Sequence, residues 1–334
     1  MTEDERAMLE PLFSTEEEII QSFGFTVLHQ AIVGIASPAV FDLPAVTDPL
    51  LDSTDTLGWT PLHWAARYRN AEALQRLILL GCDIHALTKN GETALHIAAD
   101  SGSVACAQLL LAAGASVSAT TAPTPLRTPL HQAAMSKQPS IPLLRLLIQH
   151  GAQVDTRDTG GRTPFHLAQE NPEAVRLFLS LGTNANNNVN ANANVNVSVN
   201  VDVDVNDLDD DGNTPLMNAV RLSAAEPVSL LLGEPRTDPS VVNGFGQNIL
   251  HLAALGANLA TLTILKDADL GGSGVDPDAV THNGMTAEEL FFSEVRWVLT
   301  MEEEERRKEC DVWKALMEKV RRDFQSSYLS STSV

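Results

Sequence analysis

The segment Gly58-Trp59-Thr60-Pro61-Leu62-His63-Trp64-Ala65-Ala66 has near-copies along most of the chain. Counted from the residue that stands where Thr60 does, the copies begin at Thr26, Thr60, Thr93, Thr128, Thr163, Thr214, Asn248 and Thr286. Successive starts are 34, 33, 35, 35, 51, 34 and 38 residues apart. A period of about 33 residues is typical of a unit of two helices and a loop, so we predict a solenoid whose repeats contact only their neighbours.

Each part of the repeated segment has a physical reason. Pro61 follows Thr60, and a proline in the first turn of a helix removes no intrahelical hydrogen bond, while the Thr oxygen can cap free N–H groups. The first helix of each repeat should therefore begin at this Thr. The paired alanines favour helix and let neighbouring helices approach closely. Leu-rich runs predict the second helix, which is expected to end at a left-handed glycine. These glycines are Gly81, Gly114, Gly151, Gly182 and Gly233.

The Thr-Pro-Leu-His-x-Ala-Ala signature resembles the ankyrin repeat. With its acidic balance, eroded first repeat and helical tail, the chain is similar to fungal multi-repeat ankyrin proteins. The resemblance implies an all-α ankyrin-repeat solenoid of about eight repeats over residues 25–290, with N- and C-terminal capping helices. We expect residues 1–24 to be an acidic N-terminal capping segment and residues 291–334 to be a C-terminal helix and polar tail. The helix is predicted by apolar residues at helical spacing, Trp313, Leu316, Met317, Val320 and Phe324.

A low-complexity insertion at 183–208 accounts for the 51-residue separation. Residues 188–206 alternate Val or Ala with Asn, Ser or Asp. Alternation is typical of a strand, but Asn and Asp disfavour strands, and polar low-complexity tracts often lack a fixed structure. We expect an extended excursion from the loop between the fifth and sixth repeats, tolerated because the loop is exposed. A partner-binding strand and self-association through the valines are the alternatives.

The composition limits the classes of partner. The formal net charge of −21 argues against direct nucleic-acid binding and against anionic membrane surfaces. The sequence has no apolar run of about 18 residues, so no membrane span is expected. The acidic start lacks a basic-then-apolar signal pattern, and the three cysteines are expected to be reduced thiols. We expect a monomeric, cytoplasmic protein, with the nucleus as the alternative location.

Catalysis is not expected. Although the chain has nine histidines, six of them occupy the fourth position of the repeated motif, namely His29, His63, His96, His131, His166 and His251. Spaced one repeat apart, they are expected to join neighbouring loops by hydrogen bonds, whereas zinc ligands are typically two to four residues apart. The sequence has no Gly-rich phosphate loop and no Gly-x-Ser-x-Gly elbow. We therefore predict no enzymatic activity, no metal and no cofactor.

The candidate binding residues follow from the family resemblance. It implies that partners touch the loop tip, the residue before Thr and the two residues after the Ala pair. In the second repeat these positions hold Trp59, Arg67 and Tyr68, residue types enriched at binding hot spots. The alternative is that Trp59 packs against an adjacent repeat and Arg67 is only solvated. The corresponding candidates in later repeats are Lys89, Glu92, Asp100, Arg127, Met135, Arg162 and Gln169.

These residues predict a non-enzymatic scaffold or adaptor that binds a protein or peptide partner on the concave ankyrin surface. Arg127 and Arg162 are neighbours in the repeat register and would suit a ligand that carries acidic groups. The alternative function is a nuclear transcription co-regulator or inhibitor of the acidic IκB type, which would mask a basic surface of its partner.

Overall fold

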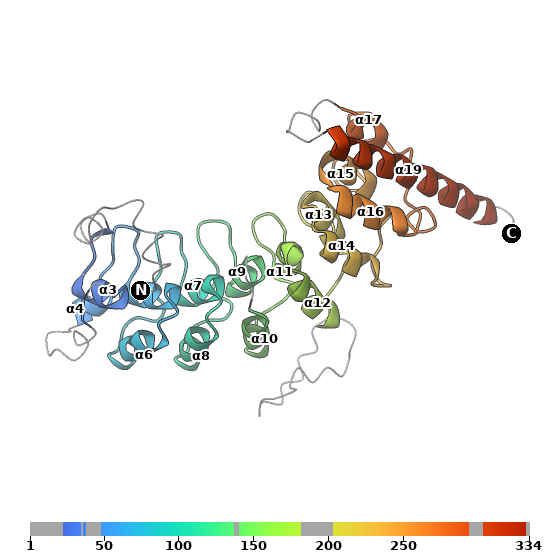
Figure 1. Ribbon diagram of the computed structural model, residues 1–334. Coiled ribbons are helices and arrows are strands. Elements are labelled where there is room, and N and C mark those ends of the chain that lie inside the picture. The colour runs from blue at the N-terminus through green and yellow to red at the C-terminus, as the bar shows by residue number, and fades with distance from the viewer. Residues whose placement is uncertain are drawn as a thin grey trace. The chain divides into compact units, whose positions relative to one another are not determined.

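The computed structural model describes residues 23–34, 36–37, 48–136, 140–181, 203–293 and 303–331. Within these ranges every regular element is helical, and the only β-type pairing is an isolated bridge between Val280 and Thr286. The predicted all-α fold is confirmed (Figure 1). The described residues form two compact units, one ending at Thr159 and the other beginning at Gly160. Residues 1–22 of the predicted N-terminal capping segment lie outside the described residues.

The first unit stacks helix pairs in two layers. Its helices are α3 (Val27–Ile32), α4 (Asp48–Leu51), α5 (Pro61–Arg67), α6 (Ala71–Leu79), α7 (Ala94–Ser101), α8 (Val104–Ala112), α9 (Pro129–Met135) and α10 (Ile141–Gln149). In Figure 1, α7 and α9 lie in one layer, α6, α8 and α10 lie in the other, and the loops project from the first-helix layer. The Ala pairs of the first helices are buried, as close approach between neighbouring helices requires.

The second unit repeats the pattern and ends in a long helix. Its elements are α11 (Pro164–Leu167), the 3-10 helix η2 (Ala168–Glu170), α12 (Pro172–Leu181), α13 (Pro215–Arg221), α14 (Ala225–Leu232), α15 (Ile249–Gly256), α16 (Leu259–Asp267), α17 (Ala287–Phe291) and α19 (Glu303–Ser331). The first helix of the fifth repeat is short because it passes into η2, and Pro172 then begins the next helix.

The motif histidines connect one repeat to the next. In the second repeat, the backbone N–H of Thr60 donates to Nδ1 of His63 at 3.2 Å, and Nε2 of His63 lies 3.2 Å from the carbonyl oxygen of Glu92 in the third repeat. Because a carbonyl can only accept, Nε2 must carry the proton and the imidazole is neutral. The predicted bonds between loops are confirmed for the pairs His29–Trp59, His63–Glu92, His96–Arg127 and His166–Asp207.

The predicted glycine ends of the second helices are confirmed in the first unit. Gly81, Gly114 and Gly151 have φ values of 89°, 97° and 91°, in the left-handed region. The prediction is wrong at Gly233, whose φ is −79°, because the chain there continues in a right-handed turn. Gly182 lies outside the described residues.

The predicted end of the insertion, at residue 208, is also wrong. Val203 and Val205 are 5% and 2% exposed, and they occupy the same register positions as the buried Ala152 and Val154. The side-chain amide of Asn206 donates to the carbonyl oxygen of Arg236 at 2.7 Å. The last valines of the alternating tract are therefore core residues of the sixth repeat, which begins by residue 203. The tract from 183 to 202 lies outside the described residues.

The helix α19 packs on α16 through one apolar face, and its Trp313 contacts Phe291 of α17. Trp313, Leu316, Met317 and Val320 are at most 2% exposed, and Trp313 stacks on Phe291 with ring centroids 4.3 Å apart. The close approach of α19 to the loop after α16 depends on Gly271, because a Cβ atom there would clash with the carbonyl oxygen of Val320.

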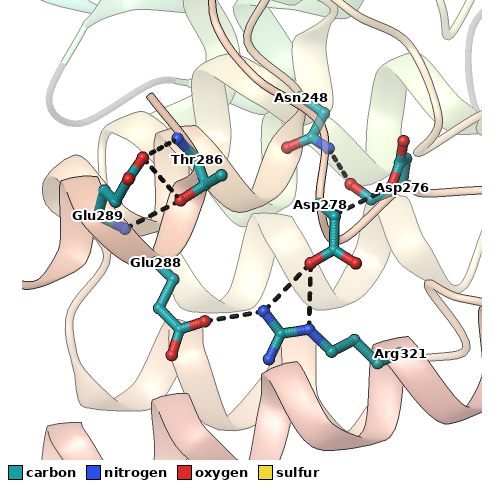
Figure 2. Close-up of polar contacts among 7 residues, drawn as sticks. All are labelled: Asn248, Asp276, Asp278, Thr286, Glu288, Glu289 and Arg321. Carbon is teal, nitrogen blue, oxygen red and sulfur yellow. Dashed lines mark hydrogen bonds and ion pairs between the residues drawn. The ribbon is translucent and has the colours of Figure 1, made fainter. Parts of the chain in front are cut away.

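Polar contacts also hold α19 in place. The ammonium group of Lys319 donates to the backbone carbonyls of Lys266, Asp267 and Ala268 at the end of α16. Figure 2 shows the Arg321 guanidinium between the carboxylates of Asp278 and Glu288, at 3.2 and 2.8 Å.

The eroded motif of the eighth repeat keeps its cap. Glu289 stands where six of the other seven repeats have His, and its carboxylate accepts from the backbone N–H of Thr286 at 2.8 Å (Figure 2). In return, the backbone N–H of Glu289 donates to the Thr286 hydroxyl at 3.2 Å. This is a capping box with an acidic partner, and it begins α17 as a histidine box begins α3, α5, α7, α9, α11 and α15.

Candidate protein-binding surface

Five aromatic rings at the start of the first unit form one cluster, which we name the ring cluster: Phe23, Phe25, Trp59, Trp64 and Tyr68. Trp64 contacts the other four, with centroid distances from 5.0 to 6.1 Å. Phe25 is buried and the remaining rings are half-buried. The cluster therefore combines a packed interior with partly exposed ring faces.

Asp55 fixes the ring cluster to the loop before α5. Its Oδ1 accepts from the backbone N–H groups of Leu57 and Trp59, each at 2.8 Å, and its Oδ2 accepts from the indole N–H of Trp64 at 2.9 Å. The Asp55 carbonyl closes the turn at Gly58. The turn at Asp55 and Gly58 is predicted by the sequence, but the bond to Trp64 is not, because the fold brings the Trp64 indole to Asp55 from nine residues away.

The predicted contact residues of the first unit define what we name the contact face: Trp59, Arg67, Tyr68, Lys89, Glu92, Asp100, Arg127 and Met135. They occupy equivalent register positions on first helices and loops that stack side by side. Trp59 packs on Trp64 and His63 of its own repeat, with centroids 5.2 and 6.2 Å away, and is half-buried. Leu57 beside it is 45% exposed, so apolar surface is available at this loop.

The charged residues on the contact face differ in their partners. Arg67 bonds Asp100 at 2.9 Å, and both side chains are about half-exposed. The Lys89 ammonium donates to the backbone carbonyl of Thr56. The carboxylate of Glu92 is half-buried, and burial together with the charge of Asp100 raises its pKa.

Arg127 is a different case, and its predicted contact role needs correction. Its side chain is 18% exposed, and Nε lies 3.5 Å from a carboxylate oxygen of the fully buried Asp158 side chain. Its backbone N–H donates to Thr121 and its carbonyl accepts from His96. Arg127 therefore holds its own loop together and offers little surface to a ligand. Met135, at the end of α9, is 38% exposed and remains accessible.

The two candidates of the second unit differ from each other. Arg162 is half-buried in the loop before α11. Gln169 is completely buried, and its amide N–H donates to the carbonyl oxygen of Phe165 at 2.6 Å. A partner cannot reach Gln169 in this conformation, so the prediction that Gln169 contacts a partner is wrong. The reason is the early end of α11, which places Gln169 in the 3-10 turn η2.

Two of the cysteines among the described residues, both in the first unit, have inaccessible thiols. Cys82 and Cys106 are buried, and burial raises the pKa of the Cys82 thiol to about 12, which disfavours the reactive thiolate. Among the described residues, no cluster of three His, Cys, Asp or Glu side chains is arranged to hold a metal ion. No helix in the described ranges is long and apolar enough to cross a membrane.

Comparison with known proteins agrees with the stacked helix pairs and their caps. A family model described as ankyrin repeats (3 copies) matches residues 28–121 and 122–192. The chain is an ankyrin-repeat protein. The ankyrin repeat domain of human ASB11 is a similar solved structure, with a TM-score of 0.54 and 25% identity, covering 72% of this chain and 96% of that one.

Curated relatives share the repeats over part of their length. A transient receptor potential cation channel subfamily A member 1 homolog of Caenorhabditis elegans is 35% identical over 156 residues, 46% of this chain and 12% of that protein. Inversin of Canis lupus familiaris is 29% identical over 159 residues, 47% and 14% of the two chains. The nuclear factor NF-kappa-B p105 subunit of Gallus gallus is 28% identical over 187 residues, 43% and 19%. This ankyrin-repeat chain thus matches less than a fifth of each of these relatives.

Proposed function

We propose that the chain is a non-enzymatic adaptor or scaffold that binds a protein or peptide partner on the contact face of its first unit. Ankyrin repeats generally mediate protein–protein interactions, and stacked repeats provide an extended surface for them. The observation that carries the proposal is the half-buried pair Trp59 and Tyr68, which both pack on Trp64 in the ring cluster. Asp55 fixes the Trp59 backbone and the Trp64 indole.

The energetics favour this site over the rest of the contact face. Large aromatic side chains contribute most at interfaces when they enter a desolvated centre. Here Trp59 and Tyr68 pack on Trp64 before any partner arrives, so little side-chain entropy remains to be lost on binding. The exposed Leu57 extends the apolar surface next to Trp59.

A nuclear co-regulator or inhibitor of the IκB type is the second candidate. It is favoured by the net charge of −21 and by the similarity to the NF-kappa-B p105 subunit. A fluorescent fusion distinguishes the two, because a co-regulator must enter the nucleus under some condition and a cytoplasmic adaptor need not. Exclusion from the nucleus under all conditions would remove this candidate.

The proposal is tested by combining Trp59→Ala with Tyr68→Ala. A partner is first identified by affinity purification with the unaltered chain and mass spectrometry, and its Kd is then measured by titration. We expect at least roughly tenfold weaker binding, since Trp and Tyr are among the residue types enriched at binding hot spots. The thermal unfolding midpoint should change little. The matched control is Leu79→Ala, a 78% exposed apolar residue on α6 in the other helix layer, which should leave the Kd unchanged. Equal Kd values for the double variant and the unaltered chain would refute the site.

A further inference from the structure

The cations at contact positions of the first unit already have oxygen partners. Arg67 is paired with Asp100 at 2.9 Å, Lys89 donates to the Thr56 carbonyl, and Arg127 lies against Asp158. Glu92 has no such counterpart. No Lys, Arg or His in the described part of the chain forms an ion pair with its carboxylate. The unmatched charge at the contact positions is therefore negative, contrary to the acidic ligand predicted from Arg127 and Arg162.

The Glu92 carboxylate is held in a defined place. Oε1 lies 3.4 Å from the side-chain nitrogen of Gln132 on α9, and Oε2 lies 3.5 Å from the hydroxyl of Thr88. Both contacts are long, so strong hydrogen-bonding capacity remains on the two oxygens. The carboxylate is also half-buried, and burial together with the charge of Asp100 raises its pKa by more than the nearby charge of Arg67 lowers it.

Aromatic surface lies one repeat away. Trp59 and Glu92 both stand immediately before the helix-starting threonine of their repeats, so they are neighbours along the stack of loops. The bond from His63, which contacts the Trp59 ring, to the Glu92 carbonyl ties the two loops together. A half-buried indole and a carboxylate that forms no ion pair within the described residues thus stand at equivalent positions of two adjacent loops.

We propose that the partner presents an arginine side chain that stacks on Trp59 and pairs with Glu92, so that the occupant of the contact face is a basic peptide segment. This inference rests on the proposed function and specifies its partner. A guanidinium group is planar, stacks on indole and donates two parallel bonds to a carboxylate, whereas an ammonium group is more strongly hydrated and has no plane. The net charge of −21 would also speed the approach of a basic segment.

The test uses three labelled ten-residue peptides in which glycine alternates with arginine, lysine or glutamate. Fluorescence anisotropy with the full chain at about 0.15 M salt, where long-range attraction is screened, measures each Kd. We expect the arginine peptide to bind roughly fivefold more tightly than the lysine peptide, and the glutamate peptide to bind most weakly. Glu92→Gln should weaken the arginine peptide roughly tenfold, the usual effect of losing a hydrogen bond to a charged group.

The matched control is Glu72→Gln, which makes the same charge change on the exposed α6 surface, where Glu72 is paired with Arg76. The inference would be overturned if Glu92→Gln and Glu72→Gln weakened binding equally, or if the arginine and lysine peptides had equal Kd values. Either result would show that the acidic chain attracts any basic peptide without a specific site. Tightest binding of the glutamate peptide would overturn it in favour of an acidic ligand. If Trp59→Ala with Tyr68→Ala abolishes capture of the identified partner while Glu92→Gln leaves its Kd unchanged, the proposed function stands and the arginine inference fails.

Discussion

Trp59 and Trp313 have opposite environments. Trp313 is completely buried, with its ring nearly parallel to that of Phe291, at 5° and 4.3 Å. Trp59 is half-buried and meets Trp64 at 51° and 5.2 Å. In the second unit the helix α19 buries Trp313 completely, whereas in the described part of the first unit the Trp59 ring keeps part of its surface exposed. The aromatic surface of α19 is therefore taken up by packing, whereas the Trp59 ring keeps surface that the proposed partner could contact.

The largest expected effect tests this contrast directly. Trp313→Ala should lower the free energy of unfolding of the second unit by about 3–5 kcal/mol, as for other large-to-small changes in a packed core. Trp59→Ala should cost under about 1 kcal/mol, because the half-buried ring leaves no closed cavity when it is removed. Urea unfolding followed by circular dichroism measures both changes. Similar losses for the two variants would show that Trp59 is a core residue and would weaken its role in binding.

Local signals explain why so much of the fold could be predicted. The Thr cap and its histidine lie three residues apart, so the start of each first helix is encoded within one turn. The period of the motif then places each helix pair beside the next. Even the eroded eighth copy keeps its cap, because Glu289 replaces histidine in the same box.

The errors arise where a residue's environment is set by another repeat or by a break in the period. Arg127 was expected to contact a partner, but it forms an ion pair with the buried Asp158, thirty-one residues later. Gln169 is buried because α11 ends early. The insertion was predicted to end too late because Val203 and Val205 fit the alternating low-complexity pattern as well as the core positions of the repeat. Counting back from Thr214 by the repeat register would have found them.

Lowering the pH should reduce the stability of the first three repeats, which contain His29, His63 and His96. Burial lowers the pKa of His63 and His96 to about 4, and lowers that of His29, whose ring stacks on Phe25. The unfolded chain therefore binds more protons than the folded one between pH 6.5 and 4, and stability is lost as the pH falls through this window. At pH 5 each of the two histidines with a pKa near 4 should cost about 2 kcal/mol relative to pH 7.

Thermal melts at pH 7, 6 and 5 measure this effect, in a range above the ordinary pKa of most carboxylates. His63→Gln should flatten the dependence of the unfolding midpoint on pH, although it lowers the midpoint itself by removing the bond to Glu92. The control His85→Gln, on an exposed loop, should keep the slope of the unaltered chain. A midpoint that does not fall from pH 7 to pH 5 would contradict the neutral, buried histidines described above.

The smallest expected effect concerns the polar attachment of α19. Arg321→Gln removes the guanidinium between Asp278 and Glu288, but all three side chains are substantially exposed, at 38%, 69% and 44%. Such pairs contribute little in water, so we expect a loss of about 0.5–1 kcal/mol in the free energy of unfolding, and a smaller loss at about 0.5 M salt, where the pair is screened. The control Arg322→Gln makes the same charge change at an exposed position of α19. If Arg321→Gln destabilised the chain as much as Trp313→Ala, the polar network and not the buried tryptophan would hold α19. The packing of α19 would then depend on salt and charge. The difference between Trp313 and Trp59 in apolar burial would no longer explain why α19 stays in place.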